Sequence, residues 1–189
     1  MTGMWALPNV LTASRIVLVP LLFLALSHGG DRALVWALVV AGIAEVTDLL
    51  DGFIARRFNQ ASEFGAKFDP LADSLYRLGA FTALAANGLI PVWAIVVFAW
   101  RDVVVSYARL MMQSNGRAVG ARLSGKLKAI VQGVAIIALL AAPLLPPDWI
   151  PATTAALIAQ TSFWLAIVVT AWSGIDYLLA GLRNAGGKA

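Results

Sequence analysis

Four aspartates within an apolar part of this chain could together bind metal ions. Asp48 and Asp51 are three residues apart, and Asp69 and Asp73 are four apart, so each pair lies on one face of its segment if that segment is helical. Carboxylates in an apolar segment are costly unless they are paired or bind a cation. Oxygen ligands without His or Cys favour Mg²⁺, Mn²⁺ or Ca²⁺. The spacing predicts a divalent-metal site, and four carboxylates suffice for two ions that stabilise a displacement at phosphorus.

Small residues and an arginine accompany these aspartates. Gly52, Ala55 and Gly65 leave open surface where a phosphate or a flat group could approach the backbone. Close helix packing is the alternative interpretation for each of them. Arg56 can hold a phosphate through two parallel hydrogen bonds, which favours a ligand contact at this position.

The composition is that of an integral membrane protein. Of the 189 residues, 60% are hydrophobic and 13% are charged, whereas soluble domains are about 45–50% apolar and about 25% charged. Cysteine is absent, which excludes disulfides and thiolate metal sites. The net charge of +4 is concentrated in certain loops, so it indicates membrane topology and no nucleic-acid partner.

Six apolar segments are each long enough to cross a bilayer, which takes ~20 residues. Pro and Gly mark nearly every junction between them. We expect an all-α protein, a polytopic membrane protein with six transmembrane helices that form a single catalytic domain. The helices are expected at about 9–27, 32–56, 66–87, 91–113, 123–145 and 151–182. Residues 1–8, which include Trp5, are expected to be an interfacial segment or a frayed tail.

Basic residues predict the orientation in the membrane. They follow the second and fourth spans and the last one, whereas the opposite junctions offer only Arg32. By the positive-inside rule, both termini and the aspartates face the cytoplasm. The residues that carry this prediction are Arg56, Arg57, Lys67, Arg117, Arg122, Lys126, Lys128, Arg183 and Lys188.

The aspartates belong to a longer frame, D-x-x-D-G-x-x-A-R-x8-G-x3-D-x3-D, which this sequence matches at every fixed position. By this frame the chain is identified as a member of the CDP-alcohol phosphotransferase family. The resemblance implies transfer of a substituted phosphoryl group from a CDP-linked alcohol to the hydroxyl of a second alcohol, with release of CMP. It also implies six membrane spans, a homodimer and two Mg²⁺ or Mn²⁺ ions per active site.

The resemblance assigns roles by position. Asp48, Asp51, Asp69 and Asp73 would be metal ligands, the first and third shared by both ions, and Asp73 would also be the general base. Contacts to the CDP-lipid would come from Asn9, Thr12, Asp51, Gly52, Arg56, Ser62 and Gly65.

Three further stretches, residues 8–15, 69–73 and 101–132, resemble the phosphatidylglycerophosphate synthase branch of the family. That branch uses CDP-diacylglycerol and glycerol 3-phosphate, and its members lie in the bacterial inner membrane. Ser74 and Ala129 differ from the usual Lys and Thr of the branch, so inositol phosphate or another alcohol stays an alternative acceptor. The residues expected to bind the acceptor phosphate are Arg109, Arg122, Lys126 and Lys128, unless they are ordinary loop charges.

Other charged residues have structural or functional interpretations. Arg77 is one helical turn from Asp73 and would orient it or form an ion pair elsewhere, and Glu45 is interpreted as a buried hydrogen-bonding residue. Arg101 and Asp102 would neutralise each other or brace the pocket. A cation transporter or channel is the distant alternative function, because carboxylates within membranes also line ion paths.

Overall fold

The computed structural model describes residues 7–57, 63–114 and 123–186. Over these residues the chain is all helical, as predicted, and contains no strand. The helices are α1 (Leu7–Ser27), α2 (Gly30–Arg57), α3 (Glu63–Ala86), α4 (Trp93–Ser114), α5 (Leu123–Ala141) and α6 (Ala152–Gly186), with a short 3-10 turn, η1 (Ala142–Leu144), after α5.

Glycine and proline end these helices where the sequence indicates. Gly29, Gly30 and Gly88 have φ values of 67°, 75° and 73°, in the left-handed region that favours glycine over residues with a side chain. Pro91 precedes α4, and Pro151 precedes α6. The connections α1–α2 and α3–α4 are therefore tight, and they bring consecutive helices side by side.

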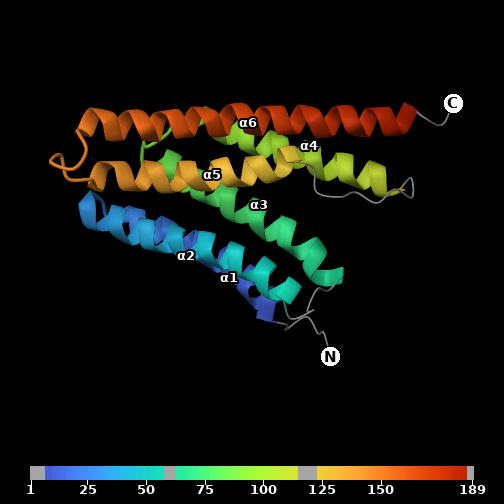
Figure 1. Cartoon of the computed structure of the whole chain (residues 1–189), viewed down its shortest axis with the longest axis horizontal. Helices are drawn as coiled ribbons and strands as arrows, with labels where there is room; N and C mark the ends of the chain where they lie inside the picture. The colour runs from blue at the N-terminus through green and yellow to red at the C-terminus, as the bar shows by residue number, and fades with distance from the viewer. Residues whose placement is uncertain (1–6, 58–62, 115–122, 187–189) are drawn as a thin grey trace.

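The helices form two groups that meet along one side (Figure 1). In the first group α1 packs against α2 and α3; in the second α6 packs against α4 and α5. α2 contacts α5 and α3 contacts α4, which joins the groups. Fully buried Ala37, Ala41 and Ala44 lie along α2, and such small side chains let helix backbones approach closely.

The two groups diverge toward the end of the molecule where α2, α4 and α6 finish and α1, α3 and α5 begin (Figure 1). A shared core closes the opposite part of the bundle, where Phe81 of α3 stacks on Phe98 of α4 with ring centroids 4.0 Å apart. The open end contains the predicted aspartates, so the arrangement holds the site between the two groups.

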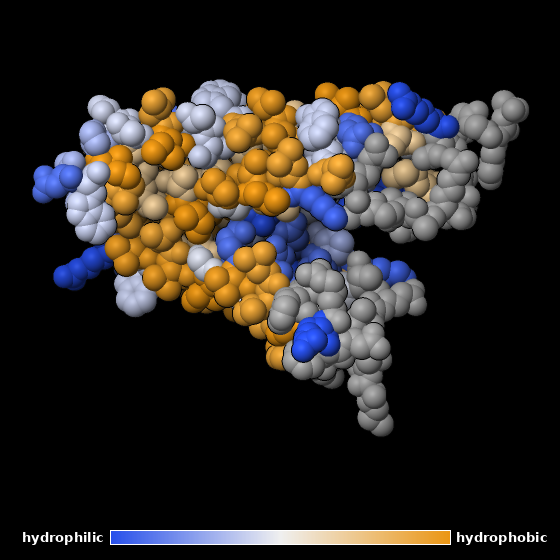
Figure 2. Space-filling view, in the orientation of Figure 1, coloured by the Kyte–Doolittle hydropathy of each residue, from blue (hydrophilic) through white to orange (hydrophobic). Residues whose placement is uncertain are grey.

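The outer surface is largely apolar (Figure 2). Large exposed side chains occur on every helix, for example Leu24, Trp36, Val96, Ile130 and Trp164. α1, α2, α5 and α6 are long and apolar enough to cross a membrane. α3 and α4 carry several charged side chains and are not among these four helices. Asp73 pairs with Arg77 on α3, and Arg101 pairs with Asp102 on α4; these four side chains are buried or half-buried. These observations indicate an integral membrane protein.

Candidate active site

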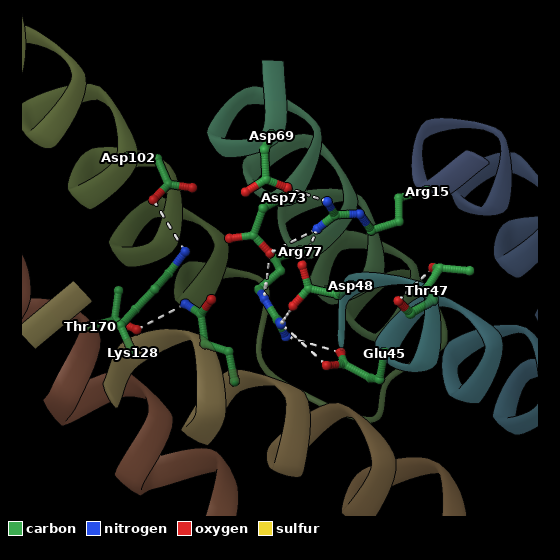
Figure 3. A network of polar contacts seen from close by, with 12 residues as sticks. Arg15, Glu45, Thr47, Asp48, Asp69, Asp73, Arg77, Asp102, Lys128 and Thr170 are labelled. Atoms are coloured by element: carbon green, nitrogen blue, oxygen red, sulfur yellow. Dashed lines mark hydrogen bonds and ion pairs between the residues drawn. The ribbon is translucent and has the colours of Figure 1, made fainter. Parts of the chain in front are cut away.

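The two pairs of aspartates come together between α2 and α3. Figure 3 shows three of them, Asp48, Asp69 and Asp73. Asp48 and Asp51 lie near the end of α2, and Asp69 and Asp73 lie near the start of α3. One carboxylate oxygen from each of Asp48, Asp51 and Asp69 falls within 4.8 Å of the others, as a common metal ion would require. Exposure of the side chains rises from 7% for Asp51 to 50% for Asp69, so the cluster is open on one side.

Arg15 of α1 inserts its guanidinium into this cluster, although its side chain is only 1% exposed. Its Nη1 donates to Asp48, and its Nη2 donates to Asp69 and, over 2.8 Å, to Oδ2 of Asp51. Nη1 also lies 3.9 Å from Oδ1 of Asp73. Arg15 is a residue of the site that was not predicted from the sequence. The available signal was a charged residue in the middle of an otherwise apolar helix, where charge calls for a partner.

A second arginine holds Asp73 from the other side (Figure 3). Nε of Arg77 donates to Oδ1 of Asp73 over 3.0 Å, and its two terminal nitrogens donate to Oε1 and Oε2 of Glu45 over 3.0 and 3.2 Å. Gly133 of α5 packs on this pair: a Cβ placed there would lie 2.6 Å from Oε2 of Glu45. Glu45 forms hydrogen bonds as expected but is half-buried, with 23% of its side chain exposed, and not buried as predicted. The contact of Arg77 with Asp73 agrees with the first of its two interpretations, as the residue that orients Asp73.

Facing the aspartates across the opening is a cationic cluster on α4 and α5, to which α6 contributes hydrogen-bond partners. Buried Lys128 donates to Oδ1 of Asp102 over 3.4 Å, and Arg101 donates to the same atom over 2.8 Å and to Oγ of Ser173 over 2.9 Å. Arg109 donates to the Tyr177 hydroxyl over 3.4 Å, and its guanidinium lies 5.4 Å from the centre of that ring. The expectation that Arg101 and Asp102 neutralise each other matches this geometry.

One cavity of about 690 Å³ joins the acidic and basic clusters. Figure 2 shows it as a hydrophilic hollow between two apolar surfaces. The charged residues that line it are Asp48, Lys67, Asp69, Asp73, Arg101, Asp102, Arg109, Lys126 and Lys128. The cavity could thus hold a molecule that carries anionic groups, in contact with both clusters.

A second groove of about 470 Å³ lies between α2 and α5 and shares Asp48 with the cavity. Glu45 and Arg77 are its polar residues besides Asp48, and the rest of its lining includes Leu49, Ile130, Val134, Ile137 and Ala138. The groove therefore extends from the charged site along apolar helix surfaces.

The structure brings most of the predicted site residues together. Thr12 on α1 donates from Oγ1 to Oδ2 of Asp51 over 2.9 Å, while Asn9 is buried one turn earlier on α1. Gly65 is half-buried near the start of α3. Ser62 and Arg122 lie outside the described residues, as do residues 1–6 of the expected interfacial segment. For Gly52 and Arg56 the structure describes only their place on α2.

The donor set fits a hard divalent cation. The converging atoms are carboxylate oxygens, the ligands that Mg²⁺ and Mn²⁺ prefer in proteins. The four carboxylates exceed the charge of the two arginines that touch them, Arg15 and Arg77, so negative charge is left for further cations. These residues can therefore hold the metal ions that the sequence predicts.

Comparisons with known proteins identify relatives over nearly the whole chain. A family model described as CDP-alcohol phosphatidyltransferase matches residues 5–172. A "Probable phosphatidylglycerophosphate synthase" of Mycobacterium tuberculosis (strain CDC 1551 / Oshkosh) is 37% identical over 186 residues, which cover 96% of this chain and 84% of the relative. The "CDP-diacylglycerol--glycerol-3-phosphate 3-phosphatidyltransferase" of Bacillus subtilis (strain 168) is 32% identical over 186 residues, which cover 92% of this chain and 94% of the relative. A "Cardiolipin synthase (CMP-forming)" of Streptomyces coelicolor is 38% identical over only 52% of this chain.

Proposed function

Since this chain belongs to the CDP-alcohol phosphatidyltransferase family, we propose that it transfers the phosphatidyl group of CDP-diacylglycerol to glycerol 3-phosphate. The products are phosphatidylglycerophosphate and CMP, in phospholipid biosynthesis. The observation that carries the proposal is a cavity in which three of the family aspartates, Asp48, Asp69 and Asp73, face a cluster of basic side chains. The fourth, Asp51, is linked to the same cluster of carboxylates through Arg15. A pyrophosphate donor and a phosphorylated acceptor both need such complementary charge near the reacting atoms.

Asp48, Asp51, Asp69 and Asp73 would hold two Mg²⁺ or Mn²⁺ ions. When bound, such ions supply charge stabilisation to the attacking and leaving oxygens of a displacement at phosphorus. The chain's own contribution is to bring ligands from two helices to one place, with the residues of α1 behind them.

Asp73 would be the general base. The hydroxyl oxygen of the acceptor forms a bond to the phosphorus that carries the diacylglycerol, and that phosphorus loses its bond to the oxygen of CMP, which leaves with the electron pair. The hydroxyl proton passes to the Asp73 carboxylate. Arg15 and Arg77 both approach Oδ1 of Asp73, so we assign the proton to Oδ2.

Lys126, Lys128 and Arg109 would bind the phosphate of the acceptor, with Arg122 as a fourth candidate. The first three line the same cavity as Asp69 and Asp73. Arg101 was not among the residues predicted to bind the phosphate, but it shares the Asp102 carboxylate with Lys128 and lines the cavity too. Ionised donors form hydrogen bonds to phosphate that are about twice as strong as neutral ones.

For the donor, Asn9, Thr12, Gly52, Arg56, Ser62 and Gly65 would contact the CDP moiety. The acyl chains would follow the groove between α2 and α5. Two features support this direction: the groove shares Asp48 with the cavity, and its lining away from Glu45 and Arg77 is apolar. The reactive pyrophosphate would then lie at the metal ligands while the lipid tails stay in an apolar environment.

We place the protein in the bacterial inner membrane as a homodimer of single-domain subunits with six spans each. α3 and α4 would cross the bilayer with their charged faces toward the cavity. The site end, which contains Lys67, Lys126 and Arg183, would face the cytoplasm, because basic residues concentrate on that side of membrane proteins.

The test is CMP release by the purified protein with CDP-diacylglycerol, Mg²⁺ or Mn²⁺, and one acceptor at a time. The acceptors are glycerol 3-phosphate, inositol phosphate, inositol, serine and phosphatidylglycerol, the last because one relative is named a cardiolipin synthase. Release with glycerol 3-phosphate is the expected result. Release with a different acceptor alone would overturn the acceptor assignment and retain the phosphatidyl transfer.

A further inference from the structure

Arg15 stands at the point where the metal ligands converge. It comes from α1, whereas the carboxylates that it contacts come from α2 and α3, so one guanidinium links three helices. Its bonding partners are 33, 36 and 54 residues away in the sequence. The side chain is enclosed by protein, which removes water as a competing partner.

The contacts of Arg15 are directed at this cluster. Among the described residues, every hydrogen bond and ion pair of its side chain goes to one of the four aspartates. Its Nε–H is buried and has no hydrogen-bond partner in the described part of the chain. A guanidinium with five donors is well suited to bridging carboxylates. In Arg15 both terminal nitrogens bond aspartates, while the Nε–H bonds none of the described residues.

A metal ion that binds the carboxylate oxygens bridged by Arg15 would compete with the guanidinium for the space between them, because both are cations and each needs its own spacing of the oxygens. Mg²⁺ takes its oxygen ligands at about 2.0–2.1 Å in a near-octahedral shell, whereas an ionic N–H···O contact joins its heavy atoms over about 2.7–2.9 Å. Nη2 of Arg15 already binds Oδ2 of Asp51 and Oδ1 of Asp69, two of the three residues whose oxygens converge.

We propose that Arg15 is a positioning residue that holds the metal-free carboxylate cluster together and gives up its contacts to Asp51 and Asp69 when a divalent cation binds. The inference rests on the proposed metal-dependent function. In the metal-free protein Arg15 offsets the repulsion among the carboxylates and keeps α1, α2 and α3 in register. The affinity for the metal is then reduced by the cost of displacing Arg15, because only the fraction of molecules in which Arg15 has withdrawn can bind the ion.

The experiment measures Mn²⁺ binding to the purified protein without substrate, from the loss of the free-Mn²⁺ electron paramagnetic resonance signal. Arg15→Gln is expected to tighten the Mn²⁺ dissociation constant roughly tenfold or more, because the competing state is removed. The same variant is expected to have a lower melting temperature without metal and a larger rise on Mn²⁺ addition than the wild type.

Arg109→Gln is the matched control. It removes one guanidinium from a residue that lines the same cavity but whose hydrogen bond goes to Tyr177. If general electrostatics explained the effect, Arg109→Gln would tighten Mn²⁺ binding as much as Arg15→Gln, and the proposal would be wrong. Arg15→Lys guards against a folding defect in the Gln variant: its single ammonium retains the charge but cannot bridge as a fork, so an intermediate affinity is expected.

Two other results would overturn the proposal, and they differ in what they mean for the proposed function. If Arg15→Gln and Arg15→Lys bind Mn²⁺ equally to or more weakly than the wild type, Arg15 supports the bound ion and does not compete with it, while the transferase function stands. If the folded wild type binds no Mn²⁺, the metal site of the proposed function fails, and this inference fails with it.

Discussion

Nε of Arg77 donates a hydrogen bond to Oδ1 of Asp73 over 3.0 Å, and the two residues are one turn apart on α3. The other end of the Arg77 guanidinium is fixed by two bonds to Glu45 on α2. Asp73 therefore has one oxygen held in place by a side chain that is itself anchored to a neighbouring helix. Such indirect support is how a reactive group keeps a productive orientation.

Asp73→Asn tests the general base. The amide has nearly the shape of the carboxylate but cannot take the acceptor's proton, so kcat for CMP release should fall by roughly 10²–10⁴-fold. Binding of the CDP moiety, measured separately with labelled CDP-diacylglycerol, should be largely retained. Asp148→Asn, an exposed change outside the site, is the control and should leave kcat unchanged. Near-normal turnover by Asp73→Asn would remove the assignment of the base.

Glu45→Gln tests the brace behind Asp73. It replaces one of the two oxygens that hold Arg77 by an amide group, so Arg77 and Asp73 lose part of their fixed geometry. We expect kcat to fall by roughly tenfold, since small displacements of reacting groups are costly. The KM for the acceptor should stay unchanged, because Glu45 bonds Arg77 and not the acceptor cluster. An increase in that KM with unchanged kcat would show that Glu45 acts in acceptor binding instead. Asp31→Asn, an exposed change at the start of α2, is the matched control.

Gly133→Ala tests the packing of α5 on the same pair. The added Cβ would lie 2.6 Å from Oε2 of Glu45 and 3.2 Å from Nη1 of Arg77, so the pair or the helix must shift. Overpacking of this kind costs about 1–3 kcal/mol of unfolding free energy, and it should lower kcat as Glu45→Gln does. Thermal unfolding and CMP release together measure the effect.

Gly42→Ala provides the comparison for that prediction. Gly42 lies inside α2, and nothing is within 4 Å of a Cβ placed there. The change should stabilise the protein by about 0.5–1 kcal/mol, because alanine is a better helix former than glycine. If Gly42→Ala and Gly133→Ala have the same effect on thermal unfolding and on CMP release, close packing at Gly133 does not position Glu45 and Arg77.

The sequence predicts the metal-binding aspartates of the site better than it predicts the residues that hold the site together. The aspartates could be assigned because helical spacing places each pair on one face, and Pro and Gly mark where α2 and α3 are connected. The charge of Arg15 within an apolar helix indicates that it needs a partner, but the sequence does not say which one. Its partners are 33 to 54 residues away, and periodicity within one helix does not show which neighbouring helix it meets. The hydrogen bond from Arg101 to Ser173, which are 72 residues apart, could not be predicted for the same reason.

The end of α1 was predicted more accurately than the end of α6. The end of α1 at Ser27 coincides with the expected one, since two glycines follow. α6 continues to Gly186, beyond the expected end near residue 182, because the residues after Leu182 are compatible with helix once a long apolar segment precedes them. Apolar runs predict where a helix enters a membrane and are less informative about where it ends.

Lys126→Ala tests the acceptor pocket. Lys126 is exposed and lines the cavity beside buried Lys128. Loss of an ionic contact to phosphate should raise the KM for glycerol 3-phosphate by roughly tenfold, the lower part of the range for charged hydrogen bonds, because Lys126 is solvated. Arg183→Ala on the last turn of α6 is the charge-matched control. A change confined to CDP-diacylglycerol binding would assign Lys126 to the donor instead.

The central claim is metal-dependent phosphatidyl transfer at the four aspartates, and label transfer tests it most directly. Purified protein is incubated with CDP-diacylglycerol and radiolabelled glycerol 3-phosphate, with Mn²⁺ or after chelation, and label in the lipid phase is counted with CMP. We predict labelled lipid and CMP in equal amounts with Mn²⁺, and neither after chelation or with Asp69→Asn. Equal rates of lipid labelling with and without divalent metal, or by Asp69→Asn and the wild type, would contradict the account.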